Sequence, residues 1–441
     1  MDIDTLFREH SERTDGALAD LSVPPFDDLG RQRRIRSTRI AVATFSAVAV
    51  VAGVALLLPR SASLPVAEER STTTASVTTT RVVTDDPVAL TGAELIATQW
   101  TSHKLGTDPR AVIGVGSISY VESKGFYIAG TYWAPEITSY QPRLWRSTDG
   151  VGWGVVPGSA RFGESRVIGD ERGMVAWGEG FVWVSQDGTD WTSAEINVPE
   201  PLSGMVLDSG EFILYGGGSE DFDTGSTGEE TSVLLSADGI TWDIIPAPVA
   251  FSAMVQLDSG ELVATGGPAD QPMTWTSPDG RVWTQLSEDH SISQGQGVMV
   301  NTLVAAGPGL VAGGTNAAGE AAFWVSTDGR VFQETAGFPP NGPIDSWPDM
   351  AGLPSVQAIA VGQGWMVAVG DYGWGGDQGR GIGGGAVWIS QDGYYWEPVP
   401  VNLIDRRGTG LGDVAYGGST FVAIGDRNQE PLVLTWAPSS S

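Results

Sequence analysis

The stretch VSQDGTDW places two carboxylates, Asp187 and Asp190, beside a glycine and a tryptophan. Such a pair can act as a general acid and base, or supply oxygen ligands to a calcium ion. Related stretches argue against both roles: RSTDGVGW, LSADGITW, TSPDGRVW, VSTDGRVF and ISQDGYYW. Asp190 has no carboxylate counterpart in them, and the alternating aspartates of an EF-hand loop are missing. The shared pattern S-x-D-G-x-x-W therefore predicts a structural turn.

In a hairpin clasp every shared position has a role. Asp-Gly tolerates the positive φ of a tight turn, and the Ser and Asp side chains bond to backbone groups of the turn. The terminal aromatic side chain covers the hairpin and packs on neighbouring strands. The predicted clasp residues are Ser147, Asp149, Gly150, Trp153; Ser185, Asp187, Gly188, Trp191; Ser236, Asp238, Gly239, Trp242; Ser277, Asp279, Gly280, Trp283; Ser326, Asp328, Gly329, Phe332; and Ser390, Asp392, Gly393, Trp396.

A second motif precedes each clasp and recurs once more near the end of the chain. It is a short apolar strand that ends in glycine, as in GFYIAG, GELVATG, GWMVAVG and STFVAIG, and another strand-like segment such as MVQL or DVAY lies ahead of it. Strand, turn, strand, loop, strand, clasp and strand make a four-stranded antiparallel sheet. Seven units of roughly 50 residues predict an all-β fold, a seven-bladed β-propeller over residues 92–441.

The seventh unit has no clasp. Its third strand, PLVLTW, is followed only by APSSS. A blade without its outer strand would expose a sheet edge, which natural proteins avoid. We therefore expect ELIATQWTSH, at 94–103, to pair with residues 431–436 and close the ring.

The repeats resemble the Asp-box, or BNR repeat, whose usual form is S-x-D-x-G-x-T-W. This repeat is found in sialidases, in sortilin-type propellers and in the photosystem II assembly-factor propeller, where the box is structural. Asp and Trp stand one residue closer together here, as in Asp149 to Trp153, so a tighter turn is expected. The likeness to sialidases implies a rival function, an exo-glycoside hydrolase that uses three arginines, a Tyr-Glu pair and an acidic proton donor. Because the F-R-I-P type motif of those enzymes is absent, no catalytic residue is assigned.

Ahead of the repeats, residues 40–58 form an uncharged apolar run. As a helix it would rise about 28 Å, close to the thickness of a bilayer's hydrocarbon core. Arginines precede the run, so the positive-inside rule predicts a cytoplasmic tail at 1–39, a transmembrane helix at 40–58, and a Thr-rich extracytoplasmic stalk at 59–91. We therefore expect a single-pass protein of the cell membrane with its propeller outside. Only Lys104 and Lys124 are lysines, which we attribute to a GC-rich bacterial genome.

Composition restricts the partners. The formal net charge of -29 opposes binding to nucleic acid, and the lack of cysteine excludes disulfides, thiolate metal sites and a cysteine nucleophile. No cofactor is expected.

The longest and most irregular connections join strands 2 and 3 of a unit, or one unit and the next. Function usually resides on such loops. The candidate ligand-binding face carries aromatic side chains with polar handles, although each of them can instead pack its own loop: Tyr132, Trp133, Tyr140, Trp347, Tyr372 and Trp374. Glu220, Asp221 and Asp223 form a weak calcium candidate, with a solvated acidic loop as the alternative. The sequence predicts a binding or scaffolding module for an unidentified extracytoplasmic protein or carbohydrate partner.

Overall fold

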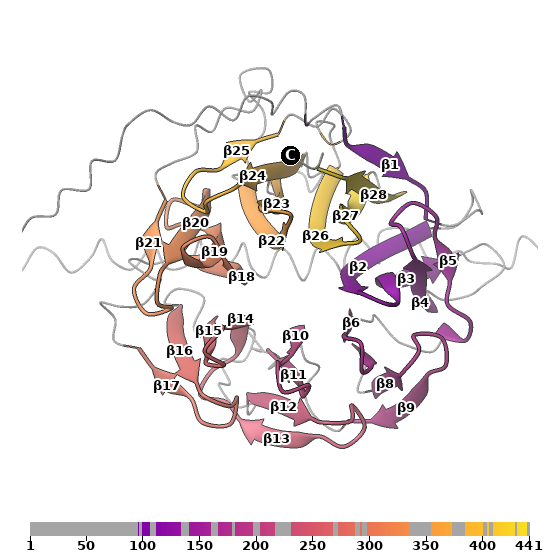
Figure 1. Ribbon diagram of the computed structural model, residues 1–441, viewed down its shortest axis with the longest axis horizontal. Helices are drawn as coiled ribbons and strands as arrows, with labels where there is room; N and C mark the ends of the chain where they lie inside the picture. Colours follow the sequence, from indigo (N-terminus) through magenta and orange to yellow (C-terminus); the bar gives the residue numbers. More distant parts are fainter. Residues whose placement is uncertain are drawn as a thin grey trace, which may run out of the picture. The chain divides into compact units, whose positions relative to one another are not determined.

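The structure is a computed structural model. It describes residues 96, 99–105, 112–133, 141–159, 166–178, 181–196, 203–216, 231–267, 272–286, 292, 298–335, 354–372, 384–399, 404, 409–427 and 430–438. Its elements are the strands β1 to β28, which form seven four-stranded antiparallel sheets. Figure 1 shows the sheets arranged as blades around a common axis. The predicted seven-bladed β-propeller is thus confirmed.

Each blade places its first strand nearest the axis and its fourth at the rim (Figure 1). The inner strands are β2 (Val112–Val121), β6 (Arg166–Gly169), β10 (Ser203–Val206), β14 (Phe251–Gln256), β18 (Met299–Ala306), β22 (Pro354–Gly362) and β26 (Thr409–Gly417). The second strands are β3 (Gly125–Trp133), β7 (Met174–Gly178), β11 (Phe212–Tyr215), β15 (Leu262–Gly266), β19 (Gly309–Thr315), β23 (Trp365–Tyr372) and β27 (Thr420–Arg427).

The third strands are β4 (Gln141–Ser147), β8 (Phe181–Ser185), β12 (Ser232–Ser236), β16 (Met273–Ser277), β20 (Ala321–Ser326), β24 (Gly385–Ser390) and β28 (Glu430–Trp436). The outer strands are β5 (Gly154–Val155), β9 (Thr192–Glu195), β13 (Asp243–Pro246), β17 (Thr284–Gln285), β21 (Gln333–Glu334), β25 (Glu397–Pro398) and β1 (Thr101–His103). We number the blades 1 to 7 by their inner strands in this order.

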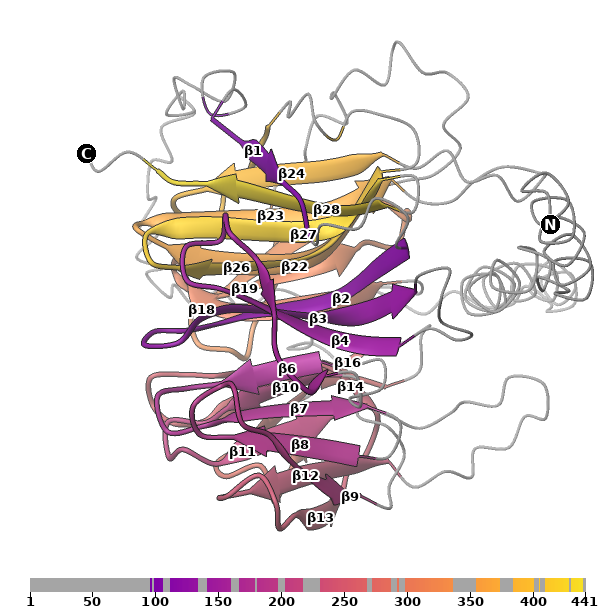
Figure 2. The ribbon, with the colours of Figure 1, turned by 90° about the vertical axis from the view of Figure 1, so that its right-hand side faces the viewer.

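The ring closes as the sequence predicts. β1, from the segment ahead of blade 1, pairs antiparallel with β28 and completes blade 7 (Figure 2), with Thr101 opposite Thr435 and His103 opposite Val433. The hydroxyls of Thr101 and Thr435 are 2.8 Å apart, and His103 Nε2 lies 2.8 Å from the Thr435 hydroxyl. The closing strand is therefore held by side chains as well as by its backbone.

The core is divided among the junctions between blades. Each junction buries apolar side chains from both of its blades, as where Ile118 and Trp145 of blade 1 pack with Val422 and Val433 of blade 7. Glycines near the ends of several second strands allow the first and second strands of the same blade to approach closely. A Cβ on Gly130 would lie 2.1 Å from the carbonyl oxygen of Gly114. The alternating apolar pattern therefore supplies both faces of every blade.

The six S-x-D-G-x-x-W copies share one hydrogen-bond pattern. In each, the Ser hydroxyl accepts a bond from the backbone N–H of the Gly at 2.8 or 2.9 Å. The Asp Oδ1 accepts bonds from the two backbone N–H groups that follow the Gly. Only the Gly has positive φ, between 73° and 78°, so the expectation that Asp shares this conformation is not met. In four copies the Trp Nε1 also donates to the Gly carbonyl: Trp153, Trp242, Trp283 and Trp396.

We expect Ser185→Ala to destabilise the protein more than Asp187→Ala. The Ser185 hydroxyl is buried and accepts from Gly188 N–H, so its loss leaves a buried donor unpaired and costs about 1 to 3 kcal/mol. The N–H groups that bond to Asp187 belong to exposed residues and can turn to water. Urea denaturation of both variants measures the order, and a larger loss for Asp187→Ala would contradict it. Partner binding by the folded fraction should be unchanged in both.

Acid should weaken this clasp. Backbone N–H bonds from Asp190 and Thr189 hold the pKa of Asp187 well below its usual range. A carboxyl group whose folded pKa is depressed stabilises the fold above its unfolded pKa, and that contribution is lost as pH falls through the folded value. The clasp therefore favours folding at neutral pH.

Within the described part of the chain, no helix is long and apolar enough to cross a membrane. The predicted tail at 1–39, transmembrane helix at 40–58 and stalk at 59–91 all lie outside the described residues.

Candidate functional site

Strand order gives the ring two unlike faces. At one face the inner strands begin and the second strands end; we call this the 2–3 face. The clasps and the short turns between first and second strands occupy the other, the clasp face. The clasp face is held by its own contacts: Lys124, which is buried, donates to the carbonyls of Asp170 and Glu171 in the next blade. This arrangement leaves the 2–3 face as the candidate site.

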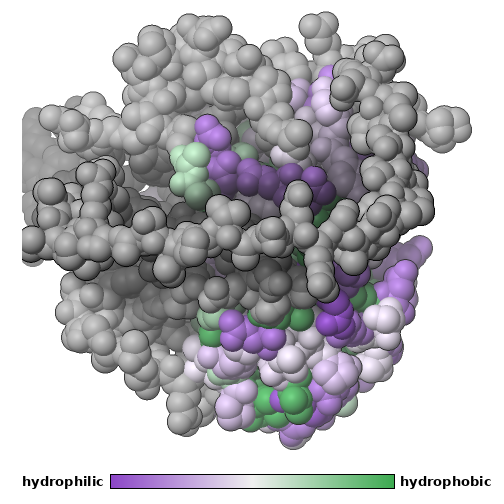
Figure 3. All heavy atoms as spheres, turned by 90° about the vertical axis from the view of Figure 1, so that its left-hand side faces the viewer, coloured by the Kyte–Doolittle hydropathy of each residue, from purple (hydrophilic) through white to green (hydrophobic). Residues whose placement is uncertain are grey.

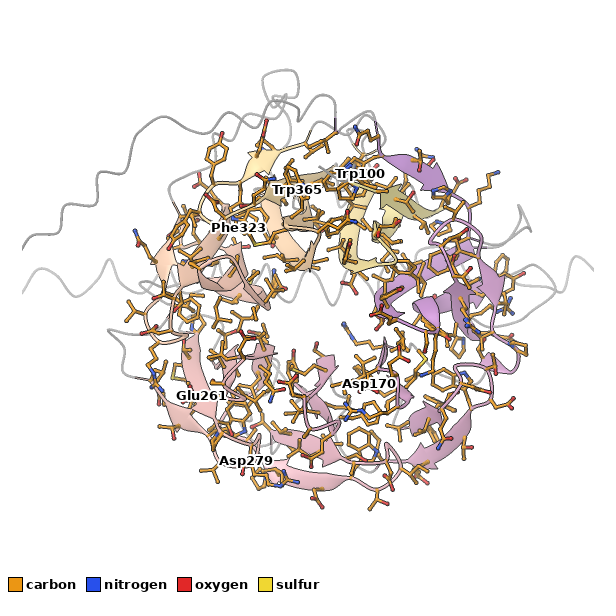
Figure 4. All side chains as sticks on the ribbon, in the orientation of Figure 1. Trp100, Asp170, Glu261, Asp279, Phe323 and Trp365 are labelled. Atoms are coloured by element: carbon orange, nitrogen blue, oxygen red, sulfur yellow. The ribbon has the colours of Figure 1, made fainter. Side chains whose placement is uncertain are left out.

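Ion pairs between neighbouring residues also hold the clasp face together. Arg281 contacts Glu211 at 3.1 Å, Arg330 contacts Glu261 at 3.3 Å, and Arg172 pairs with Asp170. Of the acids labelled in Figure 4, Glu261 and Asp279 belong to blade 4, and Asp170 lies apart from them in blade 2. On the side of the ring that carries β16, β17 and β21, the described hydrophobic residues form separate patches among hydrophilic ones (Figure 3).

Two of the six predicted aromatic residues are described in full. Tyr132 and Trp133 end β3 at the 2–3 face, and both are partly buried. The Arg143 guanidinium lies 3.7 Å from the centre of the Tyr132 ring, which also packs against the core between blades 7 and 1. Tyr132 is therefore engaged by its own blade, as the structural alternative for these residues anticipates.

The other predicted site residues give less information. Tyr372 ends β23 at the same face, but its side chain is outside the described residues. Tyr140, Trp347 and Trp374, and the calcium candidates Glu220, Asp221 and Asp223, also lie outside them. Among the described residues, no group of three or more His, Asp or Glu side chains is placed to hold a metal ion.

Polar residues of the inner strands are the part of the site that sequence reasoning missed. In blades 1, 4, 5, 6 and 7 the pairing of first and second strands shifts by one residue at a β-bulge. Near two of these bulges a side chain reaches the next blade. Asn301 Nδ2 donates to the Val356 carbonyl at 2.8 Å, and Asp413 Oδ2 accepts from Ile118 N–H at 2.9 Å. Asp413 begins the segment DVAY, so an acid opening an apolar inner strand was the available signal.

Asp413 is a carboxyl group in an unfavourable environment. Burial raises its pKa to about 6, although the N–H groups of Ile118 and Val414 and the charge of Arg166 oppose the shift. A folded pKa above the unfolded value means that the fold favours the protonated form. The contribution of Asp413 to stability is therefore greatest at low pH and is lost as pH rises through 6.

Lowering the pH from 7 to 5 should accordingly raise the contribution of Asp413 to the free energy of unfolding by about 1 kcal/mol. The measurement is urea denaturation at both pH values for the wild type and Asp413→Asn, whose side chain does not titrate. The difference between pH 5 and pH 7 should be smaller in the variant by that amount. An identical pH dependence in the two proteins would refute the assignment.

A second acid with a raised pKa lies at the 2–3 face itself, where it is partly buried. Asp371, beside Tyr372 in β23, has a raised pKa chiefly because of burial; a hydrogen bond from the Gln357 side chain opposes the shift, and the charge of Asp426 adds to it. Asp371 and Asp426 follow the last glycine of their strands, in the sequences GDY and GDR. That repeated position was the signal for both.

Comparison with known proteins shows similarity of fold. No family model matches the chain, and no curated protein matches it in sequence. The solved structure of YCF48 from Cyanidioschyzon merolae is 15% identical with a TM-score of 0.51, and covers 78% of this chain and 100% of that one. YCF48 bound to D1 peptide is also 15% identical, with a TM-score of 0.51 and coverage of 77% and 96%. Virginiamycin B lyase from Staphylococcus aureus is 10% identical, with a TM-score of 0.49 and coverage of 77% and 99%. At these identities the likeness shows the propeller fold alone.

Proposed function

We propose that this protein is a binding or scaffolding module that presents the 2–3 face of its propeller to a protein partner outside the cytoplasm. The observation that carries the proposal is the contrast between the faces. The clasp face repeats one turn in six blades, and the hydrogen bonds of that turn are satisfied within it. The 2–3 face carries unlike residues at equivalent blade positions, such as Thr315 in blade 5 and Asp371 in blade 6. A repeated turn suits a structural role, and irregular residues on a rigid ring suit recognition.

A protein partner is favoured over a carbohydrate by one comparison. In the solved structure of YCF48 bound to D1 peptide, a propeller of similar fold has a peptide as its partner. The Asp-box identity of the repeats, the sialidase-type hydrolase and the glycan partner remain hypotheses from the sequence resemblance. Release of the fluorophore from a fluorogenic sialoside by the purified chain would establish the hydrolase instead.

Site-specific photo-crosslinking tests which face binds. A photoreactive phenylalanine at position 133, on the 2–3 face, should give covalent adducts with one partner, identified by mass spectrometry. The matched control is position 282, where Val282 is 65% exposed at the clasp face. The proposal fails if position 282 gives the same adduct, or if position 133 gives none while a binding partner is independently known.

The membrane topology is proposed from the sequence. Because the chain has no cysteine, a single introduced cysteine is the only thiol that a maleimide can label. Val282→Cys should react with a membrane-impermeant maleimide in intact cells, whereas Ser11→Cys should react only after lysis. The reverse result would overturn the predicted topology.

A further inference from the structure

The junction between blades 6 and 7 at the 2–3 face differs from its neighbour. Between blades 5 and 6, Thr315 at the end of β19 donates to the Ser355 hydroxyl at 3.0 Å, and Asn301 Nδ2 donates to the same oxygen at 3.2 Å. One blade further on, Asp371 takes the position of Thr315 and Gly410 takes that of Ser355. The side chains of Thr315 and Ser355 are hydrogen-bonded between blades 5 and 6, whereas the Asp371 carboxyl group lies opposite a glycine between blades 6 and 7.

The end of β23 and the start of β26 bring Asp371 and Thr409 to the junction between the neighbouring blades 6 and 7. A Cβ on Gly410 would lie 4.0 Å from Asp371 Cβ, with no other contact within that distance. Gly385, the cross-strand neighbour of Asp371, would place a Cβ 3.4 Å from Thr409 Cγ2. Asp371 and Thr409 therefore both line this junction. No other side chain lies within 4 Å of an added Cβ at Gly410, whereas Ile404 and Leu411 also line the junction at Gly385.

Neither polar group is fully satisfied within the described structure. Thr409 is 2% exposed, and its hydroxyl has no hydrogen-bond partner. Asp371 has the Gln357 side chain as a hydrogen-bond partner, but none of the ion pairs among described residues includes it. A buried hydroxyl without a partner costs stability because it has lost its hydration, and so does a partly buried carboxyl group that makes no ion pair among the described residues.

The two acceptors indicate the chemistry of a group that could bind to them. A carboxylate and a hydroxyl oxygen are acceptors, so the complement is a donor with several N–H groups and positive charge. A compact ammonium group has three donors and fits between two short side chains. Calcium is a poorer match, since it takes six to eight oxygen ligands and usually several carboxylates. The nearby charge of Asp426 and the net charge of -29 attract any cation to this site.

We propose that the blade 6–7 junction binds the ammonium group of a lysine side chain from a protein partner, with Asp371 and Thr409 as its acceptors. This inference rests on the proposed function, because the lysine arrives with the partner at the 2–3 face. The partner is thus recognised by a lysine inserted beside the ring axis, between strands β23 and β26.

The probe is a fluorescent tripeptide, Gly-Lys-Gly, with both ends blocked, titrated against the full chain by fluorescence anisotropy. We expect it to bind more tightly than the same peptide with acetylated lysine, which has lost its charge. Asp371→Asn should weaken binding at least tenfold, as expected for a charge-assisted hydrogen bond, and Thr409→Val should weaken it severalfold. Asp258→Asn removes the same charge from an exposed turn on the clasp face and should leave affinity unchanged.

Stability separates recognition from a structural role. Because Asp371→Asn removes a partly buried charge and Thr409→Val removes an unpaired hydroxyl, neither should lower the thermal unfolding temperature. Loss of binding together with lower unfolding temperatures in both variants would overturn the proposal.

Other outcomes are equally decisive. Equal binding of the lysine and acetyl-lysine peptides, or equal losses in Asp371→Asn and Asp258→Asn, would also overturn it. n-Butylammonium carries the same ammonium group as a lysine side chain and should compete with the peptide. If it does not displace the peptide even in large excess, the peptide is held by other contacts and the proposal is wrong. The proposed function fails separately, through the crosslinking at position 133, and it survives if a partner binds there without needing a lysine.

Discussion

Trp100→Ala should lower the free energy of unfolding by about 3 to 5 kcal/mol, the usual cost of truncating a buried tryptophan. Trp100 precedes the first blade in sequence, yet it is 4% exposed in the core shared by blades 6 and 7. The ring centres of Trp100 and Trp436 are 5.9 Å apart, and the two rings are stacked. Trp365 meets Trp436 edge-on, with 5.7 Å between their ring centres, and Figure 4 shows where Trp100 and Trp365 lie. The alanine variant therefore removes the anchor of the closing strand β1.

Urea denaturation followed by tryptophan fluorescence measures this loss. Two further variants test whether the loss of stability comes from the buried ring of Trp100. Trp100→Phe keeps most of the buried area and removes an indole N–H that has no hydrogen-bond partner, so it should cost far less. Tyr394→Ala truncates a ring that is 47% exposed and should change stability by less than about 1 kcal/mol. A loss below that of Tyr394→Ala would show that blade 7 does not need its closing strand.

Gly188→Ala should cost about 2 to 4 kcal/mol, the sum of backbone strain and overpacking. Gly188 has φ of 75°, and a Cβ there would lie 1.9 Å from the Tyr127 hydroxyl and 3.2 Å from the sulfur of Met174. Tyr127 and Met174 are fully buried, so neither can move aside easily. The clasp of blade 2 is thus fitted onto the side chain of Tyr127 from blade 1.

Two other glycines separate the cost of backbone strain from the cost of overpacking. Gly260 has φ of 86° and open space around a Cβ, so Gly260→Ala should show backbone strain alone, about 1 kcal/mol. Gly152 has open space and no positive φ, so Gly152→Ala should be close to neutral. The expected order of destabilisation, by urea denaturation, is Gly188, Gly260, Gly152. Equal effects at Gly188 and Gly260 would mean that the blade junction yields to the added methyl group.

The clasp could be predicted from the sequence, whereas the contacts at the candidate site could not. The clasp is local: Ser185 bonds to Gly188, and Asp187 bonds to residues two and three positions ahead, so one short pattern contains the whole interaction. Repetition of that pattern predicted the blades and led to the proposal that the opposite face carries the site. The closing strand was also predictable, because a blade without an outer strand leaves an unpaired edge.

What the sequence alone determined is therefore the architecture: seven units, their turns and the closure of the ring. Only the tertiary structure decided which polar residues meet. Asp413 bonds to a backbone group 295 positions away, and Asp371 lies opposite Gly410 because two blades pack together. Such contacts depend on how neighbouring sheets are placed, and no local pattern encodes a distance between strands of different blades. Asp413 and Asp371 thus owe their raised pKa values to the packing of the closed ring rather than to their sequence neighbours.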